Sequence, residues 1–304
     1  MRVFTFEIDN LISAMSPLYY ISKLLGMAPY ALVHNEYHIY NYCNTLYSVL
    51  MSFCVIGLCA HHLYAFWFLV YRGNSKNYII SDVASKILLY GIAFLAITTS
   101  NVYKKSISKL IHRIISINER LVIDRKAYIK IFYILILQLI IATFSILSIF
   151  SLIHKAWEDF DGCMFFYYEA SIHIIGAIFL LQFVNFMIYV RYLYKSLNKQ
   201  LSSFLHHDVN SVNFSEELTY ENTRRCLFIY KELQEVLELI ESHFSWPIVW
   251  QTTSLFIQIV SSYYDTIKEI HDYFEVVEDC GLHLLRVFTQ AELIVFYTSS
   301  LLTM

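Results

Sequence analysis

Long blocks of apolar residues alternate with short polar segments along this chain. Six of these blocks reach or approach the roughly 20 apolar residues that a helix needs to cross the hydrocarbon core of a bilayer. The blocks lie near residues 46–70, 78–102, 128–153, 164–190, 247–264 and 282–304. The fifth is short and the sixth contains Arg286 and Glu292, so these two are the weakest. The pattern predicts an all-α membrane protein with six transmembrane helices.

A half-polar helix precedes the fifth block and is predicted to continue into it without a break. Apolar residues recur there at steps of three and four, which places them on one face of a helix. They are Leu227, Tyr230, Leu233, Val236, Leu237, Ile240 and Phe244. The other face is predicted to be wet and carries Lys231, Glu232, Glu235, Glu238 and Glu241. Trp246 suits the membrane–water boundary and Pro247 suits the first turn of the next helix, so we expect a cytosolic helix at 224–245.

The composition agrees with helices that lie in lipid. Hydrophobic residues make up 57% of the chain and charged residues only 15%, which is too apolar for a soluble fold of 304 residues. Seven Gly and three Pro leave few breaks, and this scarcity favours long helices over a barrel. The net charge is −3, and no basic tract interleaved with aromatic residues occurs outside the membrane flanks. The sequence therefore gives no indication of nucleic-acid binding.

Positive charges gather in one segment between the blocks and decide the predicted topology. Residues 103–130 carry Lys104, Lys105, Lys109, Arg113, Arg120, Arg125, Lys126 and Lys130 against only Glu119 and Asp124. By the positive-inside rule this segment is cytosolic, and alternation then places the N-terminus and residues 191–246 on the same side. The acidic segments 155–162 and 268–283 fall outside. The first outer loop is the exception, because Arg72, Lys76 and Lys86 outnumber Asp82 there.

Residues 1–38 form a separate N-terminal segment ahead of the transmembrane helical domain at 39–304. We expect a short amphipathic helix in this segment, ended by Gly26 and Pro29 and lying on the inner membrane face. The run Pro17-Leu18-Tyr19-Tyr20-Ile21-Ser22-Lys23-Leu24-Leu25-Gly26-Met27-Ala28-Pro29 resembles the opening of insect gustatory receptors. The run from Glu232 to Ile240, followed by Phe244-Ser245-Trp246, is similar to the helix before the fifth span of that family.

The resemblance implies a chemoreceptor of the plasma membrane with a cytosolic N-terminus and seven spans. It further implies a subunit of a ligand-gated cation channel that detects small taste ligands and assembles as a homo- or heterotetramer. In such an assembly the cytosolic helix would anchor neighbouring subunits. The residues expected to do so are Leu233, Leu237, Ile240, Phe244 and Trp246.

One feature of that family is absent from this sequence. Its seventh span carries Thr-Tyr followed five residues later by Gln-Phe, and the seventh helix lines the pore in the related tetrameric channels. Gln182-Phe183 is not a match, because it lies in the fourth block with no Thr-Tyr ahead of it. We therefore expect this chain to lack the pore-lining span.

A ligand pocket that is open to the outside is implied by the resemblance, among the second to fourth spans. Aromatic walls with a few polar groups suit small organic ligands. The candidates at the outer halves or ends of these spans are Tyr90, Phe144, Trp157, Tyr167 and Tyr168. Glu169 and His173 lie one turn apart on the fourth span and would bind a polar ligand or sense pH. The alternatives are an aromatic belt at the interface, and polar groups that bond to neighbouring helices.

No catalytic constellation, metal site or cofactor site stands out. His61 and His62 face different directions on one helix, so they do not form a ligand pair by themselves. The six cysteines show no CxxC spacing that would indicate zinc. Cys163 and Cys280 both fall on the predicted outside, where a disulfide or two free thiols are open alternatives.

Other classes of membrane protein are open from the sequence. A G-protein-coupled receptor needs an external N-terminus, which the basic 103–130 segment opposes. A membrane enzyme or transporter would need clustered intramembrane carboxylates or histidines, or broken helices, and the low Gly and Pro content argues against breaks. A non-conducting receptor-like protein of the same fold remains a third alternative.

Overall fold

The computed structural model describes residues 11–28, 31–33, 36–38, 42–70, 76–121, 125–156, 160–210 and 216–273. This part of the chain consists of seven helices and one short hairpin. In chain order these are α1 (Leu11–Leu24), β1 (Ala31–Val33), β2 (Glu36–His38), α2 (Tyr42–Val70), α3 (Lys76–Val102), α4 (Lys104–Arg120), α5 (Arg125–Ala156), α6 (Phe160–Asn210) and α7 (Glu216–Tyr273). The helical class is confirmed, and the hairpin is an addition that the sequence did not predict.

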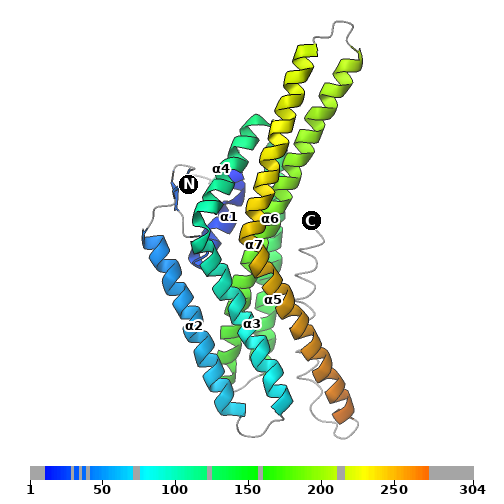
Figure 1. Ribbon diagram of the computed structural model, residues 1–304. Helices are drawn as coiled ribbons and strands as arrows, with labels where there is room; N and C mark the ends of the chain where they lie inside the picture. The colour runs from blue at the N-terminus through cyan, green and yellow to red at the C-terminus, as the bar shows by residue number, and fades with distance from the viewer. Residues whose placement is uncertain are drawn as a thin grey trace, which may run out of the picture.

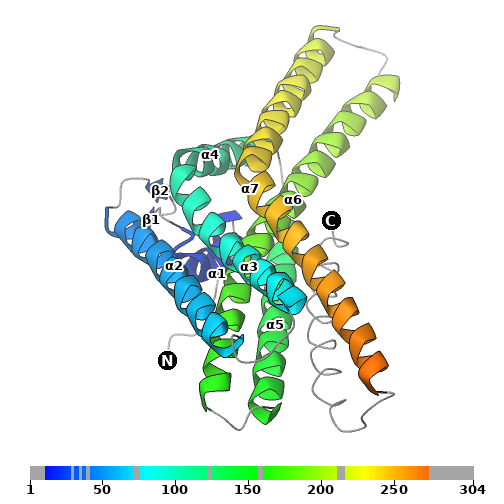
Figure 2. The ribbon, with the colours of Figure 1, turned by 60° about the horizontal axis from the view of Figure 1, so that its bottom comes forward.

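The helices form a bundle around α6, and α6 and α7 extend beyond it as a pair (Figures 1 and 2). Within the bundle α3 packs against α2, α6 and α7, while α5 packs against α6 and α1. With 51 and 58 residues, α6 and α7 are on the order of 75 to 90 Å long, far more than the roughly 30 Å of a hydrocarbon core. Much of both helices must therefore lie outside lipid.

Within the described ranges, three helical segments are long and apolar enough to cross a bilayer. They are Tyr42–His61 in α2, Lys126–Phe144 in α5 and Ser171–Phe204 in α6. A fourth is added if Lys86–Val102 and Lys104–Arg120, which meet at a bend of 70°, are taken as one span. The chain is therefore a multi-pass membrane protein.

The predicted fifth and sixth spans are not confirmed by the structure. The block at 247–264 lies within α7, but α7 is not among the candidate spans found in the part of the chain that is described. The block at 282–304 lies outside the described residues. Six spans, and the side on which the N-terminus lies, thus stay predictions.

Helix α1 ends where the sequence indicates. Gly26 has a φ of 77°, in the left-handed region that favours glycine, and the Met27 N–H donates to the Ser22 carbonyl at 2.8 Å. The helix itself is packed into the bundle on α5 and α6, whereas the prediction placed it along the membrane face. Leu18 and Ser22 are fully covered there, because each meets side chains of the bundle.

Helix α4 lies in the basic segment that the sequence identified only by its charge. Its apolar residues fall on one face and are buried: Ile107, Leu110, Ile111, Ile114 and Ile117. This face packs mainly against α7. The segment is therefore an amphipathic helix that forms part of the fold.

Helix α7 is continuous from the polar stretch into the apolar one, as predicted. Pro247 lies inside it, however, and not in the first turn of a separate helix. A proline removes one backbone hydrogen bond and bends a helix without ending it when packing holds both sides. In both ribbon views α7 changes direction where its yellow part passes into orange (Figures 1 and 2).

Candidate functional site

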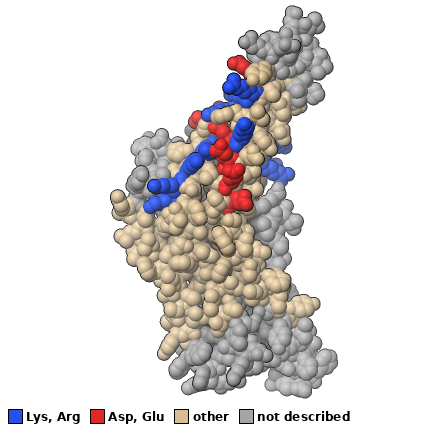
Figure 3. All heavy atoms as spheres, viewed as in Figure 1, with Lys and Arg blue, Asp and Glu red and all other residues tan. Residues whose placement is uncertain are grey.

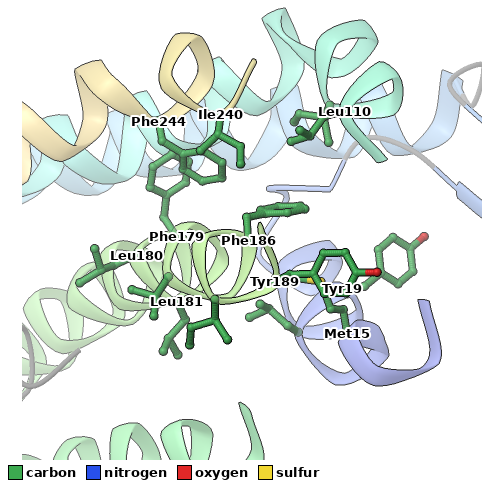
Figure 4. Packing of buried hydrophobic residues seen from close by; sticks show 14 of the residues in the cluster. Met15, Tyr19, Leu110, Phe179, Leu180, Leu181, Phe186, Tyr189, Ile240 and Phe244 are labelled. Atoms are coloured by element: carbon green, nitrogen blue, oxygen red, sulfur yellow. The ribbon is translucent and has the colours of Figure 1, made fainter. Parts of the chain in front are cut away.

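The contact between α6 and α7 is a cluster of aromatic rings. Phe244 is 1% exposed, and its ring centroid lies 5.0 Å from that of Phe179, 5.4 Å from Phe183 and 6.0 Å from Phe186. Figure 4 shows Phe244 and Ile240 pointing from α7 toward Phe179 on α6. Tilted aromatic pairs at these distances add to the stabilisation that comes from burial. This cluster holds the two longest helices together.

The residues predicted to anchor neighbouring subunits differ in their exposure. Leu233, Ile240 and Phe244 are buried within their own chain, and Leu237 is partly buried. Trp246 is 69% exposed. A contact with another subunit in this arrangement would therefore use Trp246 and not the three buried side chains.

The buried face of α7 keeps most of the predicted stripe and differs from it only near the start of the helix. Leu227 and Tyr230 are exposed. The buried positions in this stretch are Cys226, Ile229, Leu233, Val236, Ile240, His243 and Phe244. Leu233, Val236, Ile240 and Phe244 are therefore buried as predicted, whereas Cys226 and Ile229 take the place of Leu227 and Tyr230 at the start of the face.

Basic residues of α4 meet glutamates of α7. The Arg120 guanidinium donates to Glu232 at 3.0 Å, and Arg113 pairs with Glu235. Arg225 donates to the Arg120 carbonyl at 3.2 Å. Two of the glutamates on the face predicted to be wet therefore bind the basic helix, which ties α4 to the polar half of α7.

Three polar side chains on one face of α6 each bond to a different part of the bundle. Gln182 donates to Ser22 of α1 at 2.5 Å. Asn185 donates to Gln138 of α5 at 3.0 Å, and Tyr189 donates to Asn118 of α4 at 2.8 Å. Hydrogen bonds between buried polar side chains fix how helices are matched. The Asn185 Oδ1 atom is left without a partner among the described residues. We interpret the row as a structural device and not as a reaction centre.

His243 lies buried where α3, α6 and α7 meet. Its ring centroid is 6.0 Å from that of Tyr103 at the α3–α4 bend and 5.9 Å from Phe179. Burial lowers the pKa of His243 from 6.5 to about 4, because the charged imidazole would lose its hydration. The side chain is therefore neutral at physiological pH. Its Nδ1 atom has no hydrogen-bond partner among the residues that the structure describes.

Helices α3 and α7 make a second close contact one turn beyond Pro247. The Trp250 indole N–H donates to the Leu88 carbonyl at 3.0 Å. A Cβ atom added at Gly91 would lie 2.8 Å from the Trp250 Nε1, so only glycine leaves room for the indole. This contact fixes the position of α7 against the helix that carries Tyr90.

The predicted ligand residues lie at several places. Tyr90 is 2% exposed on α3, and His173 is partly buried on α6, which packs against α3. Phe144 is 71% exposed, on the same face of α5 as the exposed Tyr133, Leu137 and Ile140, so it points away from the bundle. Tyr167, Tyr168 and Glu169 belong to α6, but their side chains lie outside what the structure describes, as does Trp157.

No group of three His, Cys, Asp or Glu side chains that could hold a metal ion occurs in the described ranges. Cys43, Cys54, Cys59 and Cys226 are free thiols. Cys163 lies in a stretch of α6 whose side chains are not described, and Cys280 lies beyond the last described residue.

Charged side chains are unevenly distributed on the face shown in Figure 3. On the face shown in Figure 3, Lys, Arg, Asp and Glu cover the upper half, and the described lower half is free of them. The part without charges holds the described residues of α2, and the part with charges holds α4 and the extended part of α6 and α7. This division is typical of a protein that lies partly in lipid.

Comparison with known proteins agrees with this architecture. No curated protein matches the chain. A model of the 7tm chemosensory receptor family matches residues 15–304, which include both runs that resemble gustatory receptors. Since this match covers nearly the whole sequence, the chain belongs to the 7tm chemosensory receptor family.

Proposed function

We propose that this chemoreceptor is a gustatory receptor-like subunit of a ligand-gated cation channel in the plasma membrane. The family match over residues 15–304 is the observation that carries the proposal. The ligand class is small organic tastants, and the assembly is a homo- or heterotetramer. The cytosolic side carries the N-terminus, α4 and the extended pair of α6 and α7, because the basic residues 104–130 lie there.

The mechanism is a population shift, in which the ligand binds one arrangement of the helices more tightly than another. Tyr90 lies next to Gly91, whose close contact with Trp250 joins α3 to α7. A ligand that displaces α3 at Tyr90 would therefore displace α7 as well. Helix α7 continues from this contact through the aromatic cluster to the charged half, so it connects the predicted outer pocket with the cytosolic end.

The subunit anchor is proposed at the exposed side of α7. Leu227, Tyr230 and Trp246 are large apolar side chains left uncovered by their own chain. We expect Trp246→Ala to reduce assembly of tetramers while the monomer keeps its unfolding temperature. Crosslinking in membranes measures the first quantity and thermal unfolding in detergent measures the second.

Ligand-evoked currents in cells that express the full chain test the proposal. A channel subunit gives cation currents in excised patches without nucleotides, either alone or with a partner subunit of the family. A G-protein-coupled receptor loses its response in excised patches, and a non-conducting protein gives no current with any partner. Either of the last two results would contradict the proposed function.

The pocket is tested by comparing Tyr90 with Phe144 in a responding receptor. We expect Tyr90→Ala to raise the half-maximal ligand concentration on the order of tenfold, the loss expected for about 1.4 kcal/mol of contact energy. Phe144→Ala is the matched control and should leave it unchanged, since this ring points away from the bundle. Equal shifts in both variants would contradict a pocket at Tyr90.

A further inference from the structure

The cations of α4 fall into two sets with different surroundings. Arg113 and Arg120 are paired with glutamates of α7. Lys105 and Lys109 are exposed and have no ion pair among the described residues. With the exposed His112 they follow at steps of four and three, so they lie on one face, opposite the buried isoleucines. We refer to Lys105, Lys109 and His112 as the lysine face.

The start of α4 lies at the level where the apolar helices begin. Lys104 donates from Nζ to the Thr45 hydroxyl at 3.4 Å, and Thr45 lies in the first turn of the candidate span Tyr42–His61. The exposed Lys130 lies in the first turns of the candidate span Lys126–Phe144. The Lys104–Thr45 contact and the position of Lys130 place the lysine face near the polar boundary of the membrane.

The direction of α4 keeps the lysine face near that boundary. The helix turns by 70° from α3 at Tyr103, so it runs at a steep angle to a helix that enters the membrane. Its 17 residues span about 25 Å. In Figure 3 a row of Lys and Arg side chains runs along the border between the charged half and the apolar half, over the position that α4 has in Figure 1.

No acidic side chain among the described residues forms an ion pair with Lys105 or Lys109. Glu232 and Glu235 of α7 are paired with Arg120 and Arg113 of α4. Glu119 is the one exposed acidic residue of α4 and lies at its far end, more than two turns from Lys109. The lysine face therefore presents positive charge at the membrane boundary without an anion from its own helix beside it.

We propose that the lysine face binds the acidic headgroups of phospholipids in the adjoining leaflet. Anionic lipids attract Lys and Arg near the membrane surface by about 1 kcal/mol per residue, and this attraction falls off within a Debye length. The arginines hold α4 to α7 while the lysines contact lipid. The position of α4, and of α7 with it, then depends on the content of acidic lipid in the membrane. This inference concerns a lipid partner and does not depend on channel activity.

Association of labelled phosphatidylserine with the purified full chain tests the proposal. The protein is reconstituted into vesicles of phosphatidylcholine, with phosphatidylserine added in increasing amounts. We expect phosphatidylserine to associate more strongly than phosphatidylcholine, and the double variant Lys105→Gln/Lys109→Gln to lose this preference by on the order of fivefold per lysine. Raising the salt concentration should reduce the preference of the wild type.

The matched control removes two exposed cations elsewhere. Arg224→Gln/Lys231→Gln takes the same charge from one face of α7 in the extended half of the molecule, and it should keep the preference. Lys105→Arg/Lys109→Arg should keep it as well. An unchanged preference in the Lys105→Gln/Lys109→Gln variant would overturn the proposal and favour an acidic protein segment as the partner of this face. An equal loss of preference in the Arg224→Gln/Lys231→Gln control would also overturn it, because the effect would then come from net charge.

Discussion

The apolar half and the charged half of the receptor are packed in the same way inside but differ in their outer surfaces. In an apolar 18-residue stretch of each candidate span, 17% of the residues are buried in α2 and 22% in α5, against 67% in α6. The outer sides of α2 and α5 are covered with exposed leucine, isoleucine and aromatic side chains, whereas α4 and α7 carry ion pairs on theirs. The solvent outside each half therefore selects the surface residues, while helix packing selects the interior ones.

Removing a ring from the interior should have the largest effect on stability. Phe244→Ala leaves a cavity among three phenylalanines, and such changes typically cost 3 to 5 kcal/mol, so we expect a loss of about 4 kcal/mol. Thermal unfolding of the detergent-solubilised protein measures it. Trp246→Ala, two residues away and exposed, should change the free energy of unfolding by less than about 1 kcal/mol. Similar losses in both variants would show that α7 does not pack on α6 as described.

The buried histidine should make stability depend on pH. Because the pKa of His243 in the folded protein is about 4 and its ordinary value is 6.5, the unfolded chain binds more protons between these pH values. The free energy of unfolding then falls as pH drops through this window, by about 3 kcal/mol in total. His243→Leu should remove this part of the pH dependence in a series of unfolding measurements. The exposed His112→Leu is the control and should retain it.

The contact of α3 with α7 should show an intermediate effect. Gly91→Ala places a methyl group against the Trp250 indole, and overpacking of this kind costs about 1 to 3 kcal/mol. Gly57→Ala on α2 is the matched control, because no atom lies within 4 Å of the added Cβ there. That change should be neutral or slightly stabilising, since alanine favours helix. If Gly57→Ala lowered stability and Gly91→Ala did not, the surroundings described for Gly57 on α2 and for Gly91 on α3 would both be wrong.

The ion pairs of the charged half should contribute least. Arg113 and Glu235 are partly exposed, and pairs of this kind are worth less than about 1 kcal/mol. We expect Arg113→Gln to lower the unfolding temperature slightly at low salt and not at high salt. A loss as large as that of Phe244→Ala would mean that the charged half is held by electrostatics and not by its apolar interior.

The sequence predicted the helices better than their faces. The apolar blocks of α2, α5 and α6 are confirmed, because a long uncharged stretch has few other structures open to it. On α7 two overlapping apolar stripes exist, one with Leu227 and Tyr230 and one with Cys226 and Ile229. Hydrophobicity does not distinguish them, and the choice is made by the partner helices α4 and α6, which a single sequence does not reveal.

The buried face of α4 is a second feature that the sequence did not predict. The lysines and arginines of this helix predict only the side of the membrane on which it lies, whereas the isoleucines between them form its buried face. Proline favours the first turn of a helix, so Pro247 predicts a helix start, although packing on both sides keeps it within α7. Of the candidate ligand residues, Tyr90 and His173 fall on neighbouring helices and Phe144 faces outward. The pocket among them stays a prediction.

The side of the membrane on which α4 lies decides between this account and its alternatives. An epitope tag is added to the N-terminus of the full chain, and a second tag is inserted after Leu121, at the end of α4, in a separate variant. Antibody binding is then compared between intact and permeabilised cells, with surface delivery checked by biotinylation. We expect both tags to be detected only after permeabilisation. Staining of either tag on intact cells would invert the topology and contradict the assignment as a gustatory receptor-like channel subunit.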